Sequence, residues 1–256
     1  MNIIVCIKAV TMTAGSGGTL RSYDSVELNP FDRPVLETAL SLREDRGGTV
    51  TALSMGPEST RSTLSEAMAM GVDQGVLACD PAFAGSDTLA SSTVLAAAIR
   101  KLKPFDLVLF GTRTADSDTG QVGPQTAVLL DIPLVGRVHS MEPVSSGLQV
   151  ERTADHFIER FEIALPAALT IYPGAIQPRD IDLARIGPVF EQQQVIFWNL
   201  NDLGLHPKEV GDAGSATRVR SISRASHQKT CEFLKGSPPE QADELMRRLS
   251  EGGLIG

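Results

Sequence analysis

Residues 106–125 read DLVLFGTRTADSDTGQVGPQ, and this stretch decides the fold class. It begins with an apolar run that is typical of a strand buried on both faces of a parallel sheet. A polar loop rich in Gly, Thr and Asp follows, and the residues from Pro124 onward predict a helix. A buried strand that passes through such a loop into a helix is the repeating unit of open α/β sheets.

The chain on the N-terminal side of this stretch alternates in the same way. Short apolar runs predict strands, and segments with helical spacing lie between them. We predict strands at residues 3–7, 49–54, 75–78 and 107–110, and helices at residues 34–43, 59–70, 87–102 and 124–130. The fold class is therefore α/β, with an open, mostly parallel sheet flanked by helices. Lys8-Ala9-Val10 follows the first strand, so this Rossmann-like nucleotide-binding domain lacks GxGxxG.

The pattern changes after Gly136. Three further strands, the middle one alternating, predict a mixed or antiparallel addition to the sheet at residues 148–152, 157–164 and 168–172. The last sixty or so residues have too little apolar surface for a core of their own. Residues 238–249 nevertheless have the spacing of one amphipathic helix. We predict an α/β domain at residues 1–190 and a C-terminal arm at residues 191–256.

The composition excludes several functional classes. A formal net charge of −8 over 256 residues argues against nucleic acid and against anionic membrane surfaces. No apolar stretch reaches the roughly 20 residues of a membrane-spanning helix, and the first residues lack the features of a signal peptide. The cysteines Cys6, Cys79 and Cys231 have no metal-ligand spacing. We expect a cytoplasmic protein without membrane insertion and without a structural metal.

No catalytic constellation is visible. The sequence has no GxSxG, HExxH or Walker A motif. The histidines His139, His156, His206 and His227 are scattered over predicted loops and strand edges, where a surface position is the simpler interpretation. We predict no catalytic residue and no metal ligand, and whether the chain is itself an enzyme stays open.

The loop inside the opening stretch has the features of a phosphate site. It leaves the carboxyl end of a core strand, where open α/β folds bind ligands. Thr119, Gly120 and Gln121 would bring a hydroxyl and backbone N–H groups to a helix N-terminus. Asp116 and Asp118 would accept from ribose hydroxyls or order the loop by capping. A glycine-rich turn with capping acids and nothing bound fits the same spacing, so both interpretations stay open.

Two further loops leave carboxyl ends of predicted strands. Asn29-Pro30-Phe31-Asp32 precedes the first helix, and Met55-Gly56-Pro57 ends the second strand. All three loops can therefore line one crevice. Taken alone, Asn29 fits a helix N-cap as well as a ligand contact.

These segments together make the chain similar to the β-subunit family of electron-transfer flavoproteins. The resemblance runs from residue 2 to about residue 205. It is carried by Val5-Cys6-Ile7-Lys8, Asn29-Pro30-Phe31-Asp32, Ser54-Met55-Gly56-Pro57 and residues 66–73, 83–90, 116–125 and 165–167.

The resemblance implies a heterodimer in which an α subunit carries an electron-transferring FAD. The β subunit contributes a second nucleotide site, which holds AMP in many members and a second, NADH-reduced FAD in electron-bifurcating members. The loop around Gly120 and the long segment past residue 205 look more like the FAD-holding members, so FAD is favoured and AMP is the alternative. The predicted cofactor-binding residues are Ala9, Asn29, Ser54, Met55, Gly56, Asp87, Thr88, Asp116, Asp118, Thr119, Gly120, Gln121 and Val122.

The implied function is electron transfer between NADH or a dehydrogenase, by resemblance of the acyl-CoA type, and the FAD of the α subunit. In many members a Pro-Arg-Tyr segment leads into the part that docks on acyl-CoA dehydrogenases. Here Asp180 follows Pro178-Arg179, and residues 186–194 replace the rest. A simple carrier with structural AMP and a stand-alone nucleotide-binding protein are the alternatives.

Two segments add expectations to this picture. Residues 83–88 would form small-residue walls around a flavin ring, although a loop ending in an Asp/Thr helix cap fits equally. We expect the arm to pack on the α subunit, with Trp198 and the Leu245/Leu249 face buried there, because an apolar helix face needs a partner.

Overall fold

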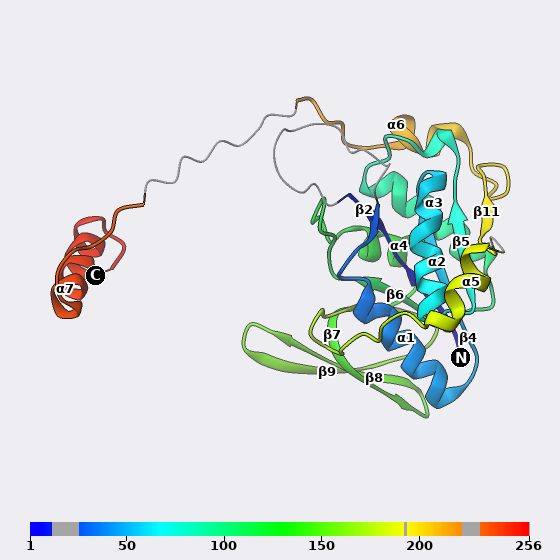
Figure 1. Ribbon diagram of the computed structural model, residues 1–256. Coiled ribbons are helices and arrows are strands. Elements are labelled where there is room, and N and C mark those ends of the chain that lie inside the picture. The colour runs from blue at the N-terminus through cyan, green and yellow to red at the C-terminus, as the bar shows by residue number, and fades with distance from the viewer. Residues whose placement is uncertain (12–25, 192–193, 222–230, 256) are drawn as a thin grey trace. The chain divides into compact units, whose positions relative to one another are not determined.

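The computed structural model describes residues 1–11, 26–191, 194–221 and 231–255 (Figure 1). The chain divides into two compact units, Met1–Val219 and Arg220–Gly256, which are described separately. The strands are β1 Asn2–Cys6, β2 Ala9–Val10, β3 Glu27–Leu28, β4 Thr49–Met55, β5 Gln74–Ala78, β6 Leu107–Gly111, β7 Leu134–Val144, β8 Gly147–Ala154, β9 Phe157–Ile163, β10 Ala167–Ile171 and β11 Ile196–Trp198. The α-helices are α1 Arg33–Arg46, α2 Arg61–Met70, α3 Thr88–Lys101, α4 Val122–Leu130, α5 Leu183–Glu191, α6 Gly211–Gly214 and α7 Pro238–Glu251, and the 3-10 turns are η1 Glu58–Thr60, η2 Pro81–Phe83 and η3 Pro207–Glu209.

The first unit is built on a nine-stranded sheet in the order β11-β5-β4-β1-β6-β10-β7-β8-β9. The strands from β11 to β7 run parallel, and β8 and β9 follow as an antiparallel hairpin extension. The predicted α/β class, the mostly parallel sheet and the antiparallel addition are therefore confirmed. β2 and β3 form a separate two-stranded ribbon.

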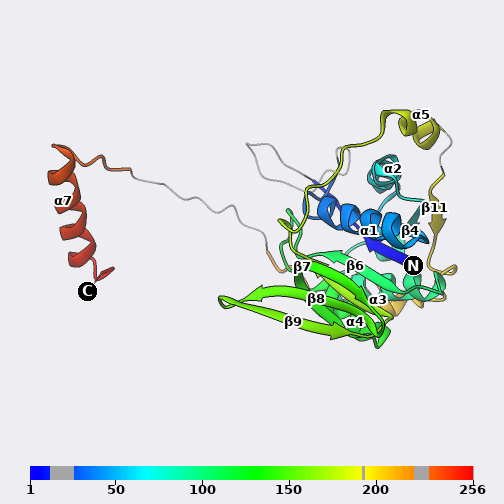
Figure 2. The same cartoon turned by 90° about the horizontal axis from the view of Figure 1, so that it is seen from below.

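Helices cover both faces of the sheet (Figure 2). Successive residues of a strand point to opposite faces, and β1 follows this rule. Ile3 and Val5 pack in one core cluster with Leu36 of α1, whereas Ile4 packs in another with Ile99 of α3. Burial on both faces explains why the central strands read as continuous apolar runs.

Two helix ends of the first unit carry the capping residues that the sequence predicts. The side chain of Asp87 accepts a hydrogen bond from the Ala90 amide at 3.0 Å and so caps α3. Gly71 follows α2 with a φ of +127°, a backbone conformation that favours glycine. The structure therefore contains the helix cap expected at the end of residues 83–88, and the proposed flavin contact of this segment stays a prediction.

The α/β unit extends beyond the predicted boundary at residue 190. β11 pairs in parallel with β5, and Val195 and Val210 are buried. Trp198 packs against this chain's own core, with the Lys101 ammonium 5.2 Å from its ring centroid. Residues 195–219 therefore belong to this unit, and β11 completes its sheet edge. Trp198 is thus half-buried against this chain's own core, because the edge of β5 offers unpaired backbone groups and apolar surface close at hand, and its burial on a partner stays a prediction.

The second unit contains α7, the amphipathic helix predicted at residues 238–249. It begins with a capping box in which the Ser237 amide donates to Glu240 at 2.7 Å. Its apolar side chains Leu245 and Met246 are exposed within this unit.

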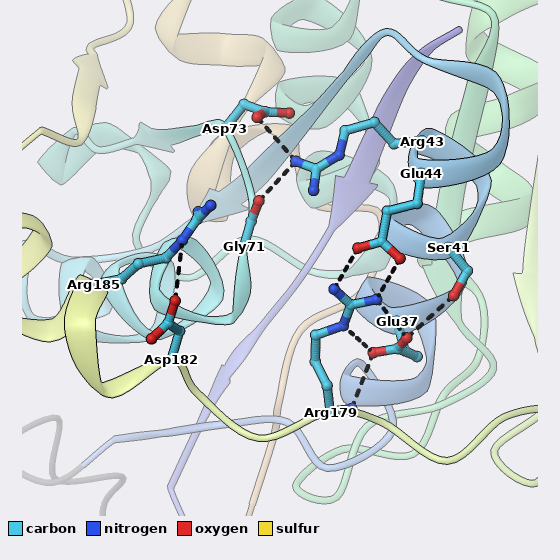
Figure 3. A network of polar contacts seen from close by, with 9 residues as sticks. All are labelled: Glu37, Ser41, Arg43, Glu44, Gly71, Asp73, Arg179, Asp182 and Arg185. Carbon is cyan, nitrogen blue, oxygen red and sulfur yellow. Dashed lines mark hydrogen bonds and ion pairs between the residues drawn. The ribbon is translucent and has the colours of Figure 1, made fainter.

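A polar network fastens the segment before α5 onto α1 (Figure 3). The Arg179 guanidinium donates to Glu37 at 2.8 and 2.9 Å and to Glu44 at 2.6 and 3.1 Å. Nearby, the Asp182 amide donates to the Ala69 carbonyl at 2.9 Å, which fixes the start of α5 beside α2. The network thus sets where α5 lies on this face of the unit.

Candidate functional site

Three loops meet at the carboxyl edge of the parallel sheet. β1 pairs with both β4 and β6, so the loops that leave these three strands are neighbours. They carry Ala9, the Ser54–Gly56 turn and the loop after Gly111. The predicted grouping of these residues at one edge is therefore a property of the fold, and it is the edge where open α/β proteins bind ligands.

The loop after β6 ends at an uncapped helix N-terminus. α4 starts at Val122, and its N-cap residue Gln121 makes no side-chain capping hydrogen bond. Gly120 has a φ of +61°, and a Cβ there would lie 3.0 Å from the Thr112 carbonyl oxygen. A glycine is therefore required for this turn, which leaves Thr119, Gly120 and Gln121 exposed at the start of α4. Free amides at a helix N-terminus attract anions such as phosphate.

The two acidic residues of the loop hold it in place. The Lys8 ammonium donates to Asp116 at 2.6 and 2.7 Å, and Arg113 Nε lies 2.9 Å from Asp118 Oδ1. Arg113 also lies over the Phe31 ring, 4.9 Å from its centroid. The ion pairs of these carboxylates thus stabilise the loop in this structure, and their contact with a ribose remains a prediction.

Asn29 is the central connector of the edge, and it is fully buried. Its Nδ2 donates to Asp32 Oδ1 at 2.9 Å and to the Arg113 carbonyl at 3.1 Å. Its Oδ1 accepts from the Ala115 amide at 3.2 Å. The simpler expectation that Asn29 caps the first helix was wrong, because Asp32 occupies the N-cap of α1. Asn29 instead ties the loop before α1 to the loop after β6.

Asp32 and Lys8 belong to this edge, although neither was among the predicted cofactor-binding residues. The Lys8 amide donates to Asp32 Oδ2 at 2.7 Å. Burial raises the pKa of Asp32 to about 7, the hydrogen bonds from Lys8 and Asn29 oppose this shift, and the charge of Asp116 adds to it. The signal that would have found Asp32 is its place in Asn29-Pro30-Phe31-Asp32, the end of the connection from the first strand to the first helix.

The end of β4 contributes a hydroxyl, and the turn that follows it contributes a required glycine. Ser54 is fully buried, and its Oγ has no hydrogen-bond partner among the described residues. An unpaired buried hydroxyl is costly, so it marks a place where a ligand or a water would gain a hydrogen bond. Gly56, next to half-buried Met55, is needed by the chain itself, because a Cβ would lie 2.3 Å from Thr60 Oγ1.

At the start of α3, Thr88 contacts this loop, whereas Asp87 hydrogen-bonds residues outside it. Thr88 Oγ1 donates to Gln121 Oε1 at 3.1 Å. The second oxygen of Asp87 accepts from the Thr217 amide at 2.8 Å and from its hydroxyl at 3.0 Å. Burial opposes the pKa shift of Asp87, but these bonds and the cap to Ala90 together lower its pKa. Asp87 is therefore ionised and already hydrogen-bonded at neutral pH.

Other features of the described residues lie apart from this edge. Within the described ranges there is no group of three side chains suited to hold a metal ion, and no described helix is long and apolar enough to cross a membrane. Two hollows of about 280 and 260 Å³ lie beside α2 and α5, and none of the predicted cofactor residues lines them. They belong to the face that the Arg179 network shapes.

An open, mostly parallel sheet with a glycine-dependent loop and an uncapped helix at its carboxyl edge is typical of α/β proteins that bind ligands at this edge. The family description "Electron transfer flavoprotein domain" matches residues 19–194. The chain is 35% identical to the electron transfer flavoprotein subunit beta of Clostridium acetobutylicum, over 98% of each chain. It is 36% identical to the caffeyl-CoA reductase-Etf complex subunit CarD of Acetobacterium woodii and 33% identical to the acryloyl-CoA reductase electron transfer subunit gamma of Anaerotignum propionicum, over the full length of each. The chain belongs to the electron transfer flavoprotein family, as a β-type subunit that serves electron transfer.

Proposed function

We propose that this chain is the β subunit of a heterodimer, that it holds FAD at the carboxyl edge, and that it passes electrons between NADH or a dehydrogenase and the FAD of an α subunit. The observation that carries the proposal is the loop after β6, which ends at the uncapped N-terminus of α4 and is fastened to two other loops of the edge. A preorganised set of amide donors at this position suits a pyrophosphate.

The residues of this chain have separate tasks in the proposed site. Thr119, Gly120 and Gln121 would donate to phosphate oxygens, and Val122 would begin the helix that directs these amides. Ser54 Oγ would find in the nucleotide the hydrogen-bond partner that the described chain does not give it. Bound FAD would supply the redox chemistry, since flavins accept hydride and release single electrons.

A partner subunit and a reductase are supported by the names of the relatives. Proteins similar over the full length are named as subunits of a caffeyl-CoA reductase–Etf complex and of an acryloyl-CoA reductase. We propose an α subunit and a dehydrogenase of acyl-CoA type as partners of this chain. The exposed apolar side chains of α7, Leu245 and Met246, give the second unit a face suited to the α subunit.

The alternative is a simple carrier with structural AMP in place of the second FAD. AMP and FAD share the adenosine half of the site, so the amides at Gly120 serve either nucleotide. A stand-alone nucleotide-binding protein is disfavoured, because full-length relatives are named as subunits of complexes.

The electron path is tested by adding NADH to the purified heterodimer without oxygen. We expect NADH to bleach the flavin absorbance. Bleaching only by an acyl-CoA substrate with its dehydrogenase would favour the simple carrier. Absence of bleaching by either donor would contradict the proposed function.

A further inference from the structure

Asp32 stands at the N-cap of α1 but does not cap it. The N-cap position favours Asp because its carboxylate accepts from the first helical amides. Here the side chain makes no capping bond, and both of its oxygens face the nucleotide edge instead. Because the most obvious structural reason for an Asp at this position is not realised, its carboxylate has another task.

We infer that Asp32 is a positioning residue that holds the nucleotide loop through Asn29 and Lys8, an inference that rests on the proposed function. The contact through Asn29 is direct. Asp32 Oδ1 accepts from Asn29 Nδ2 at 2.9 Å and so fixes which way the buried amide points. In that orientation the amide donates to the Arg113 carbonyl at 3.1 Å and accepts from the Ala115 amide at 3.2 Å.

The contact through Lys8 runs along the end of β1. Asp32 Oδ2 accepts from the Lys8 amide at 2.7 Å, and the Lys8 carbonyl accepts from the Asn29 amide at 2.9 Å. The backbone of Lys8 is thereby held while its ammonium binds Asp116 at 2.6 and 2.7 Å. One carboxylate therefore orients both groups that fasten the loop.

The sequence makes room for this carboxylate at the end of β6. A Cβ on Gly111 would lie 2.4 Å from Asp32 Oδ1 and 3.2 Å from the Phe31 carbonyl oxygen. A larger residue at position 111 would displace the carboxylate, so Gly111 and Asp32 fit each other.

The arrangement needs the ionised carboxylate. Both oxygens accept from donors, so a proton on either oxygen would face an N–H group and break one bond. The charged and titratable groups that act on it are Lys8 and Cys6 at the end of β1 and Asp116 in the loop, while the Arg113 side chain is engaged with Asp118 and the Phe31 ring. Burial raises the pKa of Asp32 to about 7, and burial together with the Asp32 charge raises the pKa of the Cys6 thiol. The carboxylate hence changes state near neutral pH while the thiol stays protonated.

The test measures how fast the purified heterodimer releases adenine nucleotide, using AMP and FAD as separate probes at pH 6 and pH 8. Asp32→Asn resembles the protonated acid at every pH, because its amide nitrogen turns a donor toward a donor. At pH 8 we expect this variant to release the nucleotide about tenfold faster than the wild type, the effect of losing one hydrogen bond to a charged group. At pH 6 the wild-type rate should approach that of the variant.

The matched control is Asp106→Asn at the amino ends of the parallel strands, away from the carboxyl edge. Asp106 also accepts from a backbone amide of β1, that of Asn2 at 2.7 Å, but it lies at the other end of the strand. We expect this control to keep the wild-type release rate and its pH dependence.

Three results would overturn the inference: wild-type release from Asp32→Asn at pH 8, equal acceleration by Asp106→Asn, or a ratio of variant to wild-type rate that is the same at both pH values. If Asp32→Asn does not assemble, the wild-type profile decides, and equal release at pH 6 and pH 8 refutes the role. A wild-type heterodimer that binds neither probe would remove the proposed function itself and this role with it.

Discussion

Replacing Arg179 tests the account of how α5 is placed beside α2. The buried Glu37 carboxylate, whose side chain is 9% exposed, accepts two bonds from the guanidinium and one from the Arg179 amide. Arg179→Met keeps the apolar stem but leaves this carboxylate without its charge partner. Removal of one partner from a buried pair is far more costly than loss of an exposed pair, because the remaining charge stays desolvated.

The expected cost lies between two limits. Breaking a fully buried pair costs about 3–5 kcal/mol, and losing an exposed pair costs about 0.2–1 kcal/mol. The Arg179 side chain is 33% exposed, so water reaches the site, and we expect about 2 kcal/mol. For a unit of this size that corresponds to a fall in melting temperature of roughly 4–8 °C.

The assay is thermal unfolding of the heterodimer, followed by circular dichroism, for a cycle of variants. Arg179→Met combined with Glu37→Gln should recover about half of the loss, because the unpaired buried charge is removed. Glu44→Gln is the control, since the half-exposed Glu44 should contribute less than about 1 kcal/mol. A melting temperature unchanged by Arg179→Met, or a double variant as unstable as the single one, would refute the reasoning.

The same pair predicts a pH dependence. The Arg179 hydrogen bonds lower the pKa of Glu37 in the folded state, against the opposing effect of burial. A lowered folded-state pKa means that the stabilisation is present above the unfolded pKa and is lost as the pH falls through the folded one. The difference between wild type and Arg179→Met should therefore be full at pH 7 and shrink below about pH 4. A difference that grows on acidification would contradict this assignment.

Two further changes follow from the nucleotide loop and the chain end. Gly120→Val places a Cβ 3.0 Å from the Thr112 carbonyl oxygen at a positive φ, and we expect it to abolish most nucleotide retention. The control is Gly253→Val, which is also at a positive φ but has nothing within 4 Å of the added Cβ, and it should retain the nucleotide. Full nucleotide occupancy in Gly120→Val would refute the loop assignment. Deleting residues 220–256 should leave the α/β unit folded and weaken heterodimer formation. Deleting residues 195–256 should also destabilise the unit, because it removes β11. Normal assembly of the chain that lacks only residues 220–256 would contradict the role of α7.

The four parallel strands and four α-helices of the sheet up to residue 130 could be predicted from the sequence because local and tertiary signals agree there, whereas the short strands β2 and β3 were not predicted. The continuous apolar runs of β1 and β6 are buried on both faces, and Asp87 and Gly71 mark real helix ends. Where the two signals conflict, prediction failed. β7 contains Gly136 and Pro143 and was not predicted as a strand, although the sheet holds it from Leu134 to Val144.

The segment 183–198 shows the same conflict. Gly187 and Pro188 disfavour a helix, yet α5 forms there, with Val189 buried in the core shared with α1 and α2. β11 was visible as an apolar segment, but its pairing with β5 depends on which edge the fold leaves open. Sequence spacing does not contain that information, so this pairing was not predicted.

The location of the candidate site could be predicted from the sequence, but the hydrogen bonds among its side chains could not. Topology alone brings the loops with Asn29, Gly56 and Gly120 to one edge. The roles of Asp32 and Lys8 depend on side chains more than twenty residues apart in the chain, which meet only after folding.

The central claim, that this chain holds FAD at the carboxyl edge, is tested most directly by counting the nucleotides released from the denatured heterodimer. The account predicts two FAD per heterodimer, one of them lost from Gly120→Val. One FAD with one AMP would contradict it and leave a simple carrier, and one FAD with no second nucleotide would contradict the nucleotide site on this chain altogether.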